Sequence, residues 1–567
     1  MEPIVYKELS SLLHLLIAAA LAIVYAKSRA VVILPALMLA SLLGVALGFE
    51  VHPFIIGISG FAAALIVFIA GLELDPHFLR MEKERILIMF IFEAILMLSL
   101  FYTLTFFLSL TLAVTLIAIM IASNEAFVVE LAKSGGGKLS HYGITLSVLE
   151  DALAVFLLSV GFFTSASLKI PMEEVGFLVS ISITLIPVLY ILSKPFDNLI
   201  DTIQRNDTRV LLTILYMAVL MALAEVLKIP EAIPVFIGSV MLSLWEFNKE
   251  TFKAIESYFI LALMGFVASL PFTIEHVGES FHPSLQTIFE AMILGIILAL
   301  LAFIFRSIIV FFASLMGGLK ITSSLKLSLS LANTGEFGLI VLASLIKTGG
   351  IPPNIAYAAM FAYAFNLTLV SIVVNNLDKV VNWLLRKPSR KIIGKLEVLS
   401  READRFIQEA SADREFKIGI LELAITVTLV YAATGFLNLY KTPLTNYLLT
   451  IFLFSAFIVA IQEVFQRFSE DIKRFSITGG GIFAFIMKFL ILYLVVAPII
   501  HFIGTTYAVS GGAQLIIPLE SPISLLLILI FSYTINLAVY RLSNLLVKSA
   551  PISENIEIEK AHSEGGQ

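Results

Sequence analysis

Two adjacent carboxylates, Glu150 and Asp151, lie inside a stretch of the sequence that otherwise carries no formal charge. The stretch 142–167 reads YGITLSVLEDALAVFLLSVGFFTSAS, which is long and apolar enough to cross a bilayer as a helix. A charged side chain at the bilayer centre costs roughly 2.5–3.5 kcal/mol on insertion scales. Two neighbouring acids at such a position therefore indicate a path for an ion or a proton.

Two other apolar stretches are interrupted by short polar runs. The first interruption is Ser123, Asn124 and Glu125, within ASNEAFVVELAK (122–133). The second is NTGE (333–336), within SLSLANTGEFGLIVLAS. Irregular backbone at membrane depth is tolerated only where protein or a water-filled cavity satisfies its polar groups. Interrupted helices in matching positions of two halves are typical of the binding site of a secondary transporter.

The composition restricts the class of protein that positions these residues. The chain has 567 residues, of which 59% are hydrophobic and only 14% are charged. Soluble proteins average about 25% charged residues, so the composition predicts a membrane protein with many spans. The sequence has no cysteine, which excludes disulfide bonds, thiolate metal sites and cysteine nucleophiles.

Two glycine-rich strings, SGGGK (134–138) and TGGGI (478–482), lack the spacing of a phosphate-binding loop or a dinucleotide fingerprint. We predict turns at helix ends there, with no nucleotide-binding domain, no resident cofactor and no nucleic-acid partner. The sequence also has no HExxH or paired catalytic-aspartate pattern. We therefore expect neither an embedded protease nor another enzyme.

The apolar runs predict about thirteen spanning helices before residue 386 and about four after it. Their approximate ranges are 9–26, 31–48, 54–72, 86–109, 111–132, 142–166, 174–193, 208–226, 232–246, 254–271, 287–315, 323–347 and 354–385, then 416–438, 446–466, 482–507 and 521–546. With the N-terminus outside, the cytoplasmic loops of the first thirteen spans carry about twenty lysines and arginines, against four in the opposite loops. This bias predicts a protein of the cytoplasmic membrane with an external N-terminus and a cytoplasmic C-terminus.

The two polar interruptions fall on the fifth and the twelfth predicted spans. If spans 1–6 and 8–13 are two blocks joined by span 7, each interruption lies on the fifth helix of its block, and the odd number of spans inverts the second block. We predict an all-α, 13-helix inverted-repeat fold with two unwound crossing helices, plus about four extra C-terminal helices. The predicted domains are a transmembrane core (1–386), a cytoplasmic linker helix (387–415), a four-helix transmembrane domain (416–548) and a disordered tail (549–567).

Five motifs in the core resemble those of the monovalent cation/proton antiporter superfamily, in the branch of Kef-type efflux proteins and bacterial Na+/H+ exchangers. The motifs are VFIAGLELDPHFLR (67–80), ASNEAFVVELAK (122–133), LEDALAV (149–155), Arg306 within LLAFIFRSIIVFFASLMGG, and ANTGEFGLIV (332–341). The resemblance covers about residues 9–386. Three positions depart from the family pattern and bear on cation choice: Glu150, the extra acid Glu125, and Thr334.

The resemblance implies one site that binds either a monovalent cation or a proton. Asp151 matches the family's ion-binding carboxylate, and removing a carboxylate from water favours its protonated form. Ser147 lies one helical turn before Asp151 on the same face. Ser123 and Asn124 would add oxygen ligands from the unwound segment. Glu125 is a further candidate ligand, with capping of the following half-helix as the alternative.

The remaining intramembrane charges have two interpretations each. Glu150 is either a second proton carrier or a partner for Arg306. We predict that Arg306 forms a charge-compensating pair with Glu336, because the two residues lie on adjacent predicted helices. For Glu93 we favour a structural hydrogen bond over a second ion path or a dimer contact. For Asn366, packing is the default interpretation.

The resemblance implies a secondary transporter that exchanges a monovalent cation for protons by alternating access, as a homodimer in membrane lipid. Na+ is the favoured cation, with Li+ or K+ as alternatives. Two other functions stay open: a K+/H+ antiporter, and a membrane sensor that keeps the transporter fold without transporting. The absence of a recognisable output domain in the sequence favours the transporter.

Overall fold

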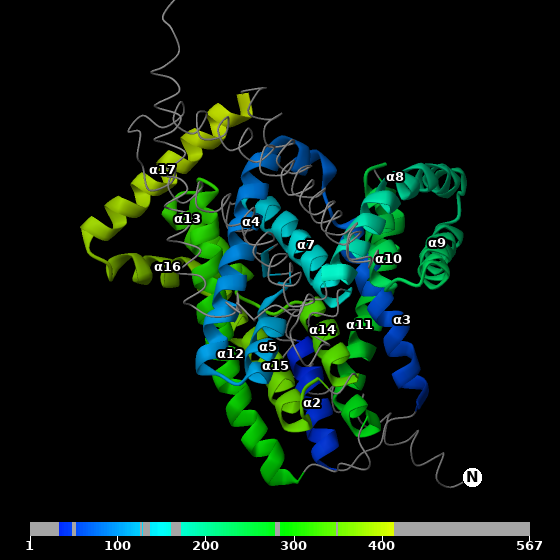
Figure 1. The fold of residues 1–567 in the computed structure, drawn as a ribbon, viewed down its shortest axis with the longest axis horizontal. Helices are drawn as coiled ribbons and strands as arrows, with labels where there is room; N and C mark the ends of the chain where they lie inside the picture. The colour runs from blue at the N-terminus through cyan, green and yellow to red at the C-terminus, as the bar shows by residue number, and fades with distance from the viewer. Residues whose placement is uncertain are drawn as a thin grey trace, which may run out of the picture. The chain divides into compact units, whose positions relative to one another are not determined.

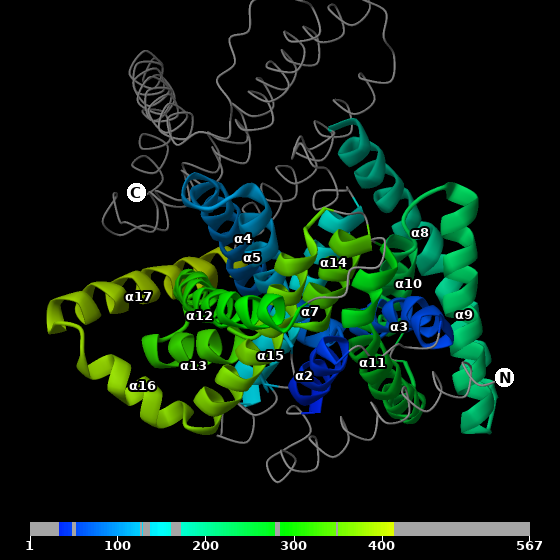
Figure 2. The same ribbon diagram turned by 90° about the horizontal axis from the view of Figure 1, so that it is seen from below.

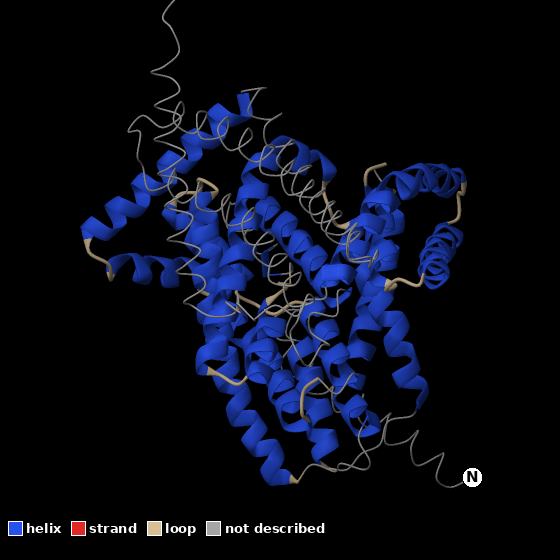
Figure 3. Cartoon of the chain, viewed as in Figure 1, coloured by secondary structure: helices blue, strands red, loops and turns tan. Residues whose placement is uncertain are grey.

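The computed structural model describes residues 33–412 except 48–52, 125–126, 129–136, 160–171, 246, 278–283 and 348–349. All of these residues belong to the first of two compact units, Met1–Phe483; the second unit, Ala484–Gln567, lies outside the described residues. The described residues form helices and loops, without a strand among them (Figure 3). This part of the chain confirms the predicted all-helical class.

One group of helices packs around α3. The group consists of α2 (Ile33–Ala46), α3 (Pro53–Leu72), α8 (Met172–Thr202), α9 (Asn206–Leu227), α10 (Ala232–Ser243) and α11 (Lys249–Val277). α3 contacts both α10 and α11, while α10 also contacts α8 and α9. These helices are rich in large apolar side chains, and their shared buried surface forms much of the main hydrophobic core.

A second group of helices packs around α12. The group consists of α4 (Pro76–Phe107), α5 (Leu110–Met120), α7 (Gly137–Ser159), α12 (Leu285–Met316), α13 (Ile321–Leu331), α14 (Glu336–Lys347) and α15 (Pro353–Asn375). α12 contacts α15, α13 and α4, and it lies beside α13 and α15 in both views (Figure 1, Figure 2). The two groups meet where α2 contacts α15 and α11 contacts α14. We call the helices around α12 the bundle.

The helix predicted at 86–109 begins ten residues earlier than its apolar run. Asp75 caps α4, accepting hydrogen bonds of 3.0 Å from the backbone N–H groups of His77 and Phe78, and Pro76 is the first helical residue. The prediction stopped where charges begin, but helical structure continues through them with a kink at Glu82. α4 therefore has a charged first section and an apolar second section.

The predicted span 354–385 is two helices, which corrects the prediction. α15 ends at Asn375 and α16 (Leu377–Arg386) begins after Asn376, whose φ of −120° and ψ of 26° are not helical. α15 is mostly apolar, whereas α16 carries charged and polar residues along one face, which suits a helix that leaves the apolar interior. A further helix, α17 (Arg390–Ala412), follows over most of the segment predicted as a linker helix.

Five described helices are long and apolar enough to cross a membrane: those at His77–Phe107, Gly137–Ser159, Asn206–Leu227, Leu285–Met316 and Pro353–Asn375. The pair α13 and α14, bent by 41° across its break, makes a sixth if it is one span. The predicted span 9–26 and the four spans after 416 lie outside the described residues. The thirteen-helix inverted repeat and the extra C-terminal helices thus stay predictions.

Candidate functional site

Both polar interruptions break their helices, and the two breaks bind each other. α5 ends at Met120, and the break between α13 and α14 spans 332–335. The backbone N–H of Gly335 donates to the carbonyl of Ala122 at 2.7 Å. Asn333 and Asn124 exchange two bonds: Nδ2 of Asn333 donates to the Asn124 carbonyl at 3.1 Å, and the Asn124 N–H donates to Oδ1 of Asn333. The interrupted segments therefore cross in direct contact.

Gly335 lies very close to the opposite segment at this crossing. A Cβ on Gly335 would lie 2.8 Å from the carbonyl carbon and oxygen of Ser123, and backbone atoms cannot move aside as a flexible side chain can. Only glycine fits between the two segments without a shift of one of them. Gly335 is part of the sequence motif, but the reason that glycine is required there is the backbone of Ser123 on the opposite segment.

We expect Gly335→Ala to destabilise the protein by about 1–3 kcal/mol, because the added methyl group overpacks the crossing. The measurement is the thermal unfolding midpoint of the purified protein in detergent. Gly265→Ala, within α11, is the matched control, since a Cβ there meets no atom within 4 Å. Equal unfolding midpoints for the two variants would contradict the close approach.

Carbonyl groups freed by the breaks accept hydrogen bonds from neighbouring helices. The Ser147 hydroxyl, on α7, donates to the Ser123 carbonyl at 2.7 Å. Nδ2 of Asn366, on α15, donates to the Ala332 carbonyl at 3.2 Å, and its Oδ1 accepts from the Thr334 hydroxyl. These bonds explain how broken helices survive in a buried place, because protein groups replace the missing helical partners. Asn366 thus supports the break, which is more than the packing role predicted for it.

The buried charges form a triad around Arg306. Its Nη1 lies 2.5 Å from Oε1 of Glu93, and its Nη2 lies 2.5 Å from Oε2 of Glu150. The Ser123 hydroxyl donates to the same oxygen of Glu150 at 2.5 Å, and Arg306 Nε donates to the Leu331 carbonyl at 3.4 Å. The exposed fractions are 1% for Arg306, 3% for Glu93 and 2% for Glu150. The guanidinium thus places its single positive charge between two buried acids, and it also donates to the carbonyl end of α13.

The predicted pair of Arg306 with Glu336 is wrong. Among the described residues, Arg306 forms its ion pairs with Glu93 and Glu150. Glu336 is the first residue of α14, where a carboxylate is favoured by the helix dipole, and it accepts a hydrogen bond from Nδ2 of Asn124. The prediction used the order of helices along the chain. The face of α12 that carries Arg306 decides its partners, and Arg306 contacts α4, α7 and α13.

Asp151 is buried beside this network, with 8% of its surface exposed. It follows Glu150 on α7 and lies four residues after Ser147, so Ser147 and Asp151 share a helix face. The Ser147 hydroxyl on that face contacts the unwound segment at Ser123. Of the two adjacent acids, Glu150 is the one that the guanidinium of Arg306 contacts at 2.5 Å. Asp151 therefore lies next to an acid that is paired with Arg306, and one turn from Ser147, which contacts the unwound segment.

The structure brings together most of the residues that the sequence proposed for the site. Ser147 and Glu150 are hydrogen-bonded to Ser123. Asn124 is hydrogen-bonded to Asn333 and Glu336 at the same crossing, whereas Glu125 lies outside the described residues. Sequence reasoning did not place Asn333 in the site, although its position in the second interruption is a sufficient signal. It also did not pair Glu93 with Arg306, although a buried arginine requires acidic partners.

The comparison with protein families agrees with this geometry. The family model described as sodium/hydrogen exchanger, transmembrane, matches residues 14–376, which is more than half of the chain. No curated protein matches the chain. The matched region contains both breaks, the acids of α7 and Arg306. The chain therefore belongs to the sodium/hydrogen exchanger family of multi-pass membrane proteins, within the monovalent cation/proton antiporter superfamily.

Proposed function

We propose that this protein exchanges Na+ for H+ across the cytoplasmic membrane by alternating access. The observation that carries the proposal is the crossing of the two breaks against α7, where Ser147 and Glu150 contact Ser123 and Asp151 lies one turn from Ser147. Family membership supports cation/proton exchange. The choice of Na+, the membrane and the mechanism of access are parts of the proposal.

One site would serve both substrates in turn. Hard monovalent cations take oxygen ligands, and the site offers the Asp151 carboxylate, the Ser147 hydroxyl and the backbone carbonyls around Asn124. When a proton binds Asp151, the negative charge that holds the cation is lost and the cation leaves. Arg306 stays paired with both Glu150 and Glu93 during this exchange. The two ions therefore compete, and competition for one charge couples their movements.

Movement of the bundle around α12 against the helices around α3 would expose the site to each side in turn. The described residues proposed for the site lie on helices of the bundle or in the break that follows α5, so they would move together as one rigid element. An external N-terminus, a cytoplasmic C-terminus and a homodimer complete the proposal, from the loop charges and from the family resemblance.

The test is proton movement in proteoliposomes that carry the full chain and enclose a pH-sensitive dye. We expect addition of Na+ to collapse an imposed pH gradient, with Li+ tested in parallel and choline as the control cation. Collapse with K+ alone would replace Na+/H+ by K+/H+ exchange. No response to any of the three cations, from protein that elutes as a single folded species, would overturn transport and favour a sensor.

A further inference from the structure

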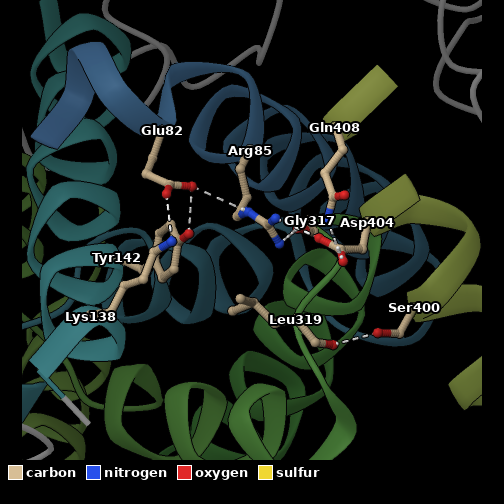
Figure 4. Close-up of polar contacts among 9 residues, drawn as sticks. All are labelled: Glu82, Arg85, Lys138, Tyr142, Gly317, Leu319, Ser400, Asp404 and Gln408. Atoms are coloured by element: carbon tan, nitrogen blue, oxygen red, sulfur yellow. Dashed lines mark hydrogen bonds and ion pairs between the residues drawn. The ribbon is translucent and has the colours of Figure 1, made fainter. Parts of the chain in front are cut away.

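α17 contacts α12, α13 and α4 of the bundle. Three of its side chains, Ala403, Phe406 and Ile407, are buried. The Ser400 hydroxyl, also buried, donates to the Leu319 carbonyl at 2.8 Å, in the turn between α12 and α13 (Figure 4). Buried apolar area and a satisfied buried hydroxyl together indicate a stable contact.

The turn between α12 and α13 is shaped to receive α17. Gly318 has a φ of +76°, and a Cβ on it would lie 2.6 Å from Cα of Asp404. The backbones of the turn and of α17 therefore touch at Asp404, and a side chain at position 318 would separate them. A contact this close is specific for one placement of α17.

Beside this contact, the Arg85 side chain of α4 binds both the end of α12 and α17. Its Nη1 donates to the Gly317 carbonyl at 2.7 Å, and its Nη2 lies 2.6 Å from Oδ1 of Asp404 (Figure 4). The Arg85 side chain is 12% exposed and that of Asp404 is 38% exposed, so the guanidinium is largely shielded from solvent while the carboxylate is partly screened. Arg85 belongs to α4, Gly317 follows α12, and Asp404 belongs to α17, so one side chain connects the three helices.

Glu82 extends the connection to α7. It pairs with Lys138 at 2.6 Å, accepts the Tyr142 hydroxyl at 2.6 Å, and lies 3.4 Å from Nε of Arg85. Figure 4 shows these side chains converging between the ends of α4 and α7, next to the α12–α13 turn. We call Glu82, Arg85, Lys138, Tyr142 and Asp404 the end cluster.

The end cluster contacts the same three helices that the buried triad joins, because Arg85 also binds the Gly317 carbonyl at the end of α12. Arg85 precedes Glu93 on α4 by eight residues, and Tyr142 precedes Glu150 on α7 by eight, each about 12 Å along a helix. Gly317 follows Arg306 on α12 by eleven residues, about 16 Å. The end cluster and the buried triad lie at different positions along α4, α7 and α12. Contacts at both positions hold the spacing and the register of these helices.

We propose that Arg85 and Asp404 are positioning residues for transport. They hold α4, α7 and α12 in the register at which Arg306 meets both Glu93 and Glu150. Because Asp151 is adjacent to Glu150, that register also sets the electrostatic field in which cation and proton compete. This inference rests on the proposed exchange of a cation for protons, and it makes α17 a working part of the transport bundle.

Arg85→Gln and Asp404→Asn test the positioning role in the proteoliposome assay. We expect each to raise the apparent KM for Na+ by roughly 3- to 30-fold, with a smaller change in maximal rate. Arg405→Gln is the matched control, because Arg405 lies next to Asp404 on α17 but pairs with Glu409 on its exposed side. Unchanged KM in the two test variants, with Na+-driven flux in the wild type, overturns the positioning role alone. No cation-driven flux in the wild type overturns the proposed function as well.

A covalent cross-link between positions 85 and 404 distinguishes a positioning role of these residues from a contribution to folding alone. The sequence has no cysteine, so Arg85→Cys with Asp404→Cys introduces a single pair that a short bis-methanethiosulfonate reagent can join. We expect the untethered double variant to show the raised KM, the tether to restore it towards the wild-type value, and reduction to reverse the restoration. A tether that stops transport would overturn the proposal, because it would mean that α17 must leave the bundle.

Discussion

Asp151→Asn is expected to reduce cation-driven proton movement to the level of protein-free liposomes. Asparagine keeps the size of the side chain and can accept a hydrogen bond, but it neither carries a negative charge nor takes up a proton at neutral pH. With asparagine at this position, the site would lose the charge that attracts the cation and the group that accepts the competing proton. The measurement is the rate of pH-gradient collapse on adding Na+.

Asp197→Asn is the matched control for this substitution. Asp197 lies on α8, in the group of helices around α3, and is 8% exposed, the same fraction as Asp151. The two variants therefore remove a similarly buried carboxylate, one beside the crossing and one in the other helix group. We expect Asp197→Asn to keep cation-driven flux. Equal flux in Asp151→Asn and the wild type would contradict the role given to Asp151.

Arg306→Met is expected to destabilise the protein by about 3–5 kcal/mol, the cost of breaking a buried ion pair by removing one partner. Methionine fills part of the space but leaves Glu93 and Glu150 buried without their cation. The Leu331 carbonyl at the end of α13 also loses its donor. The measurement is the thermal unfolding midpoint in detergent, followed by the fraction of protein that stays monodisperse.

Two further variants make this expectation specific. Lys326→Met breaks the pair of Lys326 with Asp378, whose side chain is 67% exposed, and should cost roughly 0–1 kcal/mol. Adding Glu93→Gln and Glu150→Gln to Arg306→Met should recover much of the lost stability, because it removes the uncompensated charges. If Arg306→Met unfolds at the same temperature as Lys326→Met, the triad does not support the fold.

Much of the site follows from local sequence. The acids at 150 and 151 and the polar runs at 123–125 and 333–336 stand out because a membrane span permits few polar residues. The structure places breaks at both runs, since neither can continue an apolar helix there. The helical repeat sets which residues share a face, so the sequence places Ser147 on the face of Asp151; in the structure Ser147 also contacts Ser123.

The partners of the buried charges do not follow from local sequence. Arg306 was expected to meet Glu336 and instead meets Glu93 and Glu150, on two other helices. The contact between Asn124 and Asn333 joins residues 209 positions apart. In the sequence, Glu93 is a single acid within an apolar segment. Its partner Arg306 is apparent only from the packing of α4 on α12. Which faces of two helices meet depends on the packing of all their neighbours, and no single segment encodes it.

By itself, the sequence determined that this is a helical membrane protein with two interrupted helices and an acidic pair in one span. Hydrophobicity, helical periodicity and the low tolerance of membranes for polar groups act over a few turns, so they can be read locally. Only the tertiary structure decided that the interruptions cross at Gly335, that one arginine joins two acids, and that α17 is fixed to the bundle through Arg85. Those outcomes depend on distances between segments hundreds of residues apart, which are set when the helices pack and not before.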